Sequence, residues 1–89
     1  MNVFTTIVNI LSVINGELNS IALEQAIEAA IVAGKPTTFS DGLYLGIQAT
    51  IANASTIFPD AVWRPVYVKL LTVAESLLFT PVPTPKPAS

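Results

Sequence analysis

The sequence predicts an all-α protein: a small domain of three or four helices over residues 1–80, then an extended, proline-rich C-terminal arm over residues 81–89. Two observations predict the helices. Apolar residues recur at three- and four-residue steps, which is the period of an amphipathic helix. Gly and Pro separate these segments where helices usually end. The length of 89 residues is enough for one small domain.

The first predicted helix lies at the N-terminus. Its apolar residues recur at helical spacing and are Val3, Phe4, Ile7, Val8, Leu11 and Ile14. Many of them are β-branched and have low helix propensity, so packing has to stabilise this helix. We expect the helix to end at Asn15-Gly16, with Gly16 in the left-handed conformation common after helices.

The second predicted helix is rich in alanine. Asn19 or Ser20 can cap its first turn, and Gly34 followed by Pro36 ends it. Beside a stripe of larger aliphatic residues runs a stripe of small ones, formed by Ala22, Ala26, Ala29 and Ala33. Because small side chains permit close approach, we expect Ala22 and Ala26 to contact another helix or a partner.

The segment over residues 40–56 fits two patterns. Leu43, Leu45 and Ile47 alternate with polar or small residues, as in a strand. The same segment also fits a helix, and three observations favour it. Its length exceeds that of most strands, its second half is rich in alanine, and Thr38 followed by Asp41 resembles a capping box.

The last predicted helix begins at Pro65, which suits the first turn of a helix. Asp60 can cap a short turn before it, and can pair with Arg64. The apolar residues form one side of this helix and are Val66, Leu70, Leu71, Val73, Ala74, Leu77 and Leu78.

The C-terminal arm carries a proline at every second position, and these are Pro81, Pro83, Pro85 and Pro87. This pattern predicts extended backbone. We expect the arm to contact a protein surface outside the helical body, with Val82 as its apolar anchor. Addition to the edge of a partner's sheet and docking as polyproline II remain equal alternatives.

The composition excludes several classes of function. The chain has no Cys and no His, which excludes disulfides, Cys/His zinc sites and histidine catalysis. Its four scattered Lys and Arg residues cannot form a nucleic-acid surface. Glu24 and Glu28 are the only close carboxylate pair, and their spacing is typical of a solvated helix face. We therefore expect no enzyme activity, no cofactor, no metal and no small-molecule substrate.

The low charge points to a partner. Only 11% of the residues are charged, whereas about 25% is usual in soluble domains. The simplest explanation is that another molecule covers part of the surface. Trp63, Arg64 and Tyr67 are candidate anchors, since Trp, Tyr and Arg are enriched in interface hot spots. The alternative is that Trp63 fills the end of the core while Asp60 pairs with Arg64.

The sequence thus predicts a non-enzymatic structural subunit or adaptor in a multi-chain assembly, such as a virus particle. Its partners would be copies of itself or other protein subunits. One alternative is a membrane-active or pore-forming helical protein, and another is a carrier of an apolar ligand. No signal peptide or clear transmembrane helix is predicted, and the location stays undetermined.

Overall fold

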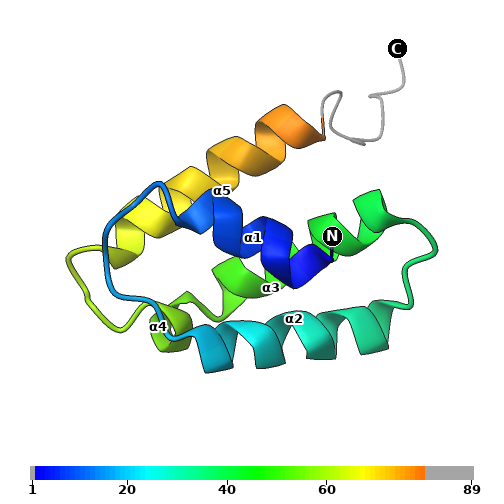
Figure 1. The fold of residues 1–89 in the computed structure, drawn as a ribbon, viewed down its shortest axis with the longest axis horizontal. Coiled ribbons are helices and arrows are strands. Elements are labelled where there is room, and N and C mark those ends of the chain that lie inside the picture. The colour runs from blue at the N-terminus through cyan, green and yellow to red at the C-terminus, as the bar shows by residue number, and fades with distance from the viewer. Residues whose placement is uncertain (1, 80–89) are drawn as a thin grey trace, which may run out of the picture.

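The computed structural model describes residues 2–79 and shows an all-helical fold (Figure 1). The prediction of an all-α protein is therefore confirmed. Four helices have at least nine residues, and one further helix is a single turn. The helices are α1 (Val3–Leu11), α2 (Ser20–Gly34), α3 (Phe39–Ala52), α4 (Ala54–Ile57) and α5 (Arg64–Leu78). The predicted arm, including Val82, lies outside the described residues.

Helix α1 occupies the centre of the fold. In Figure 1 it runs between α5 and α2, with α3 behind it. It packs against all three, whereas α2 and α5 are not packed against each other in the described part of the chain. The largest core side chains lie between these helices and include Ile7, Leu11, Leu23, Ile47, Ile57, Phe58, Tyr67 and Leu71. No helix within residues 2–79 is long and apolar enough to cross a lipid bilayer.

Two buried glycines on α3, Gly42 and Gly46, let α1 approach closely. A Cβ added to Gly46 would lie 2.7 Å from Cγ1 of Val3 and 2.8 Å from Cδ1 of Ile7. One added to Gly42 would lie 3.3 Å from Cγ2 of Val3. Carbon atoms normally stay about 3.5–4.0 Å apart, so a larger residue at position 46 has to displace α1. The spacing of these two glycines thus sets the distance between α1 and α3.

The alanine stripe of α2 is only partly a packing surface. Ala22 and Ala26 are half-buried, while Ala29 and Ala33 are exposed. Ala22 and Ala26 face α4, with which they line a hollow together with Ile57.

Side-chain caps begin three of the helices. Asn2 Oδ1 accepts a hydrogen bond from Thr5 N at 2.7 Å at the start of α1, and Asn19 Oδ1 accepts from Ala22 N at 3.1 Å at the start of α2. Thr38 Oγ1 accepts from the backbone N–H three residues later at 3.1 Å. The helical alternative for residues 40–56 is thus correct, with a break at Asn53 between α3 and α4.

The end of α1 differs from the prediction, whereas the end of α2 agrees with it. Helix α1 ends at Leu11, and Gly16 does not have a positive φ. Ser12 closes the helix because its N–H bonds to Val8 O at 2.9 Å and its hydroxyl donates to the Asn9 carbonyl. Helix α2 ends at Gly34 as expected, and the residue after it, Lys35, is left-handed with φ 47°.

Candidate functional site

A turn over residues 60–63 positions the start of α5. The Asp60 carboxylate accepts from Val62 N at 2.8 Å, and the Asp60 carbonyl accepts from Arg64 N at 2.9 Å. Pro65 then occupies the first turn of α5, where a missing N–H costs nothing. The prediction that Pro65 belongs to the start of a separate helix is confirmed.

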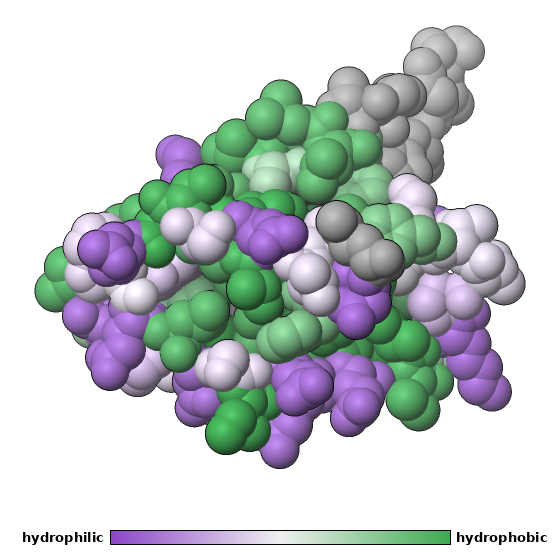
Figure 2. Space-filling view, in the orientation of Figure 1, coloured by the Kyte–Doolittle hydropathy of each residue, from purple (hydrophilic) through white to green (hydrophobic). Residues whose placement is uncertain are grey.

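Helix α5 has two apolar sides. One side packs into the core and includes the buried Tyr67 and Leu71. The residues of the other side follow one another at steps of three and four positions. They are Trp63, Val66, Leu70, Val73 and Leu77. We call this second set the α5 stripe. Within it Val66 and Val73 are each 43% exposed and Leu77 is 74% exposed. Figure 2 shows hydrophobic residues gathered over the upper part of the molecule, where α5 lies.

The spacing of the α5 stripe matches the seam of a helix that packs against another helix. Single exposed apolar residues are normal on a protein surface, but a contiguous set usually marks an interaction site. Val62 and Leu78 are also exposed and extend the apolar surface at the two ends of the helix. The stripe is therefore the candidate site for a partner.

Trp63 lies where the stripe meets the loop after α1. A Cβ added to Gly16 would lie 2.9 Å from Cγ of Trp63 and 3.1 Å from Cε2 of Tyr67. Gly16 therefore serves the close approach of two aromatic rings, and not a left-handed turn. Trp63 keeps 38% of its surface exposed, so one side of it is anchored and the other is open to a partner.

The other two predicted anchors, Tyr67 and Arg64, make hydrogen bonds within the chain. Tyr67 is 1% exposed and stacks on Phe58 with ring centres 4.4 Å apart. Its hydroxyl accepts from Gly16 N at 3.1 Å and donates to Ile14 O at 3.4 Å. Arg64 donates through Nε to the Phe58 carbonyl at 2.9 Å. Hydrogen bonds from Arg64 to backbone carbonyls thus take the place of the expected Asp60–Arg64 pairing. Trp63 is the most exposed of the three side chains, since Arg64 is half-buried and Tyr67 is buried.

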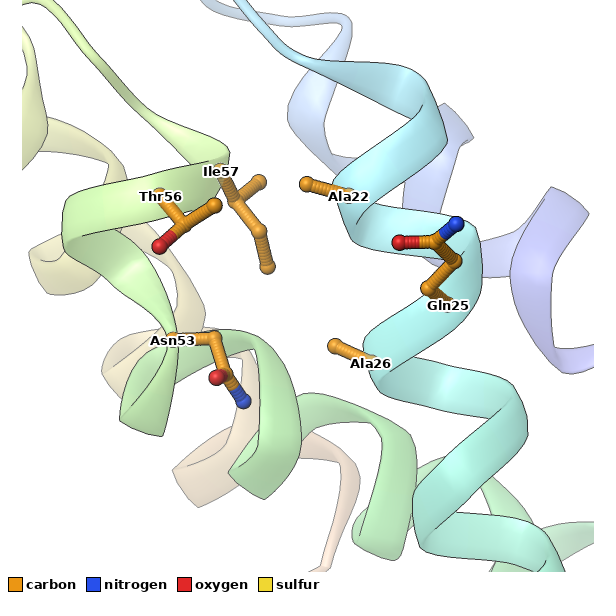
Figure 3. Close-up of a pocket in the computed structure, with 6 residues that line it drawn as sticks. All are labelled: Ala22, Gln25, Ala26, Asn53, Thr56 and Ile57. Carbon is orange, nitrogen blue, oxygen red and sulfur yellow. The ribbon is translucent and has the colours of Figure 1, made fainter.

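A hollow of about 250 Å³ lies between α2 and α4 (Figure 3). Ala22 and Ala26 form its α2 side with Gln25, and Asn53 and Thr56 face them from the α4 side. The Asn53 amide already donates to the Ala49 carbonyl at 2.8 Å. The hollow carries no charged group, so it offers packing and hydrogen bonds but no acid–base chemistry.

A groove of about 220 Å³ lies between α1 and α2. Apolar residues line it, notably Phe4, Ile27 and Ile31, and Glu24 and Glu28 stand at its edge. Both carboxylates are exposed, as expected for a solvated helix face. The sequence alone did not reveal that they border an apolar groove, because that depends on where α1 lies. We call this feature the α1/α2 groove.

The apolar residues of α5 were predicted to form one side of the helix, whereas the structure divides them between the core and the exposed stripe. The signal was present, because the residues fall into two sets at helical spacing that point in different directions. Within residues 2–79 no group of three or more acidic side chains is placed to hold a metal ion. Comparison with protein-family models, curated proteins and solved structures found no match.

Proposed function

We propose that the protein is a non-enzymatic structural subunit or adaptor that binds another protein chain through the α5 stripe. One observation carries this proposal: a folded helix whose core side is already packed exposes a second row of large apolar residues. Burial of apolar surface stabilises a complex by about 25 cal/mol per Å² before the costs of association. A partner helix laid along the stripe would remove this surface from water.

The surroundings of the stripe support a protein partner over a lipid surface. Helices that lie in a membrane interface usually carry several Lys and Arg residues on their polar face. On α5, Arg64 is bonded to backbone carbonyls, which leaves Lys69 as the one basic residue on the exposed side of this helix. With a net charge of −2, the chain has little attraction for anionic lipid. The virus-particle setting stays a prediction from the sequence.

The experiment compares Val73→Glu with the matched control Thr72→Glu. The two positions are adjacent on α5 and both are exposed, so the change in charge and in helix propensity is the same. We expect wild type and Thr72→Glu to associate in sedimentation velocity over a concentration series, and Val73→Glu to stay monomeric. Circular dichroism should show the same helix content in all three.

Two results would contradict the proposal. If Val73→Glu associates as wild type does, the stripe is not the interface. If wild type is monomeric but floats with neutral lipid vesicles, and Val73→Glu does not, the stripe binds lipid and the membrane-active alternative is correct.

A further inference from the structure

Resting on the proposed function, we infer that the partner of the α5 stripe is a second copy of this chain, which receives the stripe and Lys69 in its α1/α2 groove. The two surfaces are different, so each copy can offer its stripe to one neighbour and its groove to another. The contact would then repeat from head to tail.

The groove sets the chemistry of its occupant. Its floor is apolar, and Glu24 and Glu28 lie one helical turn apart at its edge, about 6 Å between Cβ atoms. Both carboxylates are exposed and have no hydrogen bond or ion pair within the described residues. No Lys or Arg occurs in α2 itself. The groove therefore suits an apolar side chain that has a cation beside it.

Helix α5 presents this combination. Lys69 directly precedes Leu70, so its ammonium group flanks the stripe while its aliphatic stem can lie along apolar surface. Among the described residues the other cations are Arg64, which is bonded to the Phe58 and Pro59 carbonyls, and Lys35, which caps α2. Within residues 2–79, only Lys69 therefore stands beside an exposed apolar row.

The charges favour the groove over a second α5 stripe as the docking surface. Two α5 helices packed antiparallel would bring both copies of Lys69 to the same edge of the contact. The acidic residue of this helix, Glu75, is held toward α3, where it accepts a hydrogen bond from Gln48, and so it does not lie at the contact beside Lys69. Like charges at an interface weaken association. Docking onto Glu24 and Glu28 replaces this repulsion with attraction.

The fold keeps the two surfaces of one copy apart. Helix α1 lies between α5 and α2, which are not packed on each other in the described part of the chain (Figure 1). The groove can therefore take α5 only from another copy. Its 220 Å³ exceeds the ~150 Å³ of an apolar cavity that holds benzene, so an aliphatic side chain of the stripe fits. A contact between unlike surfaces closes into a ring or continues as a filament.

A charge exchange tests this arrangement in the full chain. Lys69→Glu and the pair Glu24→Lys with Glu28→Lys change only exposed side chains, so the fold should persist, which circular dichroism checks. We expect each charge variant alone to raise the dissociation constant for self-association by about tenfold. All three substitutions in one chain should restore it to near the wild-type value, and so should an equimolar mixture of the two charge variants.

A second mixture separates this inference from the proposed function. Val73→Glu keeps its groove, and the Glu24→Lys, Glu28→Lys variant keeps its stripe, so together they should form a 1:1 complex and nothing larger. If Val73→Glu abolishes association while the groove variant associates normally, the stripe is the interface but its partner is another stripe. If Val73→Glu has no effect, the proposed function fails as well. Either result would overturn the inference.

Discussion

Replacing Gly46 by Ala tests whether the glycines of α3 set the position of α1. The added Cβ would lie 2.7 Å from Val3 Cγ1 and 2.8 Å from Ile7 Cδ1. The end of Ile7 can rotate away, but the β-branched Val3 has few alternatives in a helix. Overpacking of this kind costs about 1–3 kcal/mol, and the better helix propensity of Ala returns about 1 kcal/mol. We expect a net loss of about 1 kcal/mol in the free energy of unfolding, within a range of about 0–2 kcal/mol.

The assay is thermal unfolding followed by circular dichroism in dilute solution. A loss of 1 kcal/mol lowers the Tm of a domain this size by about 4–8 °C. The control is Gly34→Ala, whose Cβ would meet only the mobile end of Leu45, so its Tm should stay near wild type or rise. In a Val3→Ala background the cost of Gly46→Ala should shrink, because the closest obstacle is gone. A Gly46→Ala protein that is more stable than wild type by the full ~1 kcal/mol of helix propensity would refute this packing of α1 on α3.

Three further substitutions test individual contacts. Tyr67→Phe removes the hydroxyl that bonds Gly16 N and Ile14 O, so we expect a loss of about 0.5–1.5 kcal/mol in urea unfolding and faster hydrogen exchange at the Gly16 amide. Lys35→Gly removes the steric strain that a Cβ causes in the left-handed backbone after α2, so it should raise the Tm by several degrees. Lys35→Ala keeps the Cβ and should not raise the Tm. Gly16→Ala should push the single Trp63 toward solvent, so its fluorescence should shift to longer wavelength while the helix signal persists; an unchanged spectrum would show that the ring does not lie on Gly16.

Local signals in the sequence predicted much of the fold. Thr38 and Asn19 cap helices because a cap needs only a side-chain oxygen and an N–H two or three residues later, which the sequence shows directly. Pro65 likewise marks a helix start without reference to the rest of the chain. The end of α1 was predicted wrongly, because the role of Gly16 depends on residues far away in the sequence. A side chain at this position would clash with the rings of Trp63 and Tyr67, which lie about fifty positions later in the chain.

The candidate site was less predictable for the same reason. Whether Val73 or Leu71 faces the core depends on how α5 is rotated against α1 and α3, and both fit one apolar side in the sequence. The chemistry of Trp63, Arg64 and Tyr67 also gave no indication that two of them bond inside the chain. The groove beside Glu24 and Glu28 exists only once α1 and α2 are placed together.

The hydrogen bond between Gly16 and Tyr67 has a consequence for the order in which the chain folds. It joins positions 51 residues apart, whereas the contacts between α2 and α3 close a loop of only a few residues. Short loops lose less chain entropy on closing, so the α2–α3 hairpin can form early. Helix α5 leaves the ribosome after the other described helices, and until it docks the core lacks the side chain of Tyr67. During synthesis the nascent chain therefore exposes the apolar surface that α5 will cover, and this is the period in which a chaperone or a neighbouring chain can reach it.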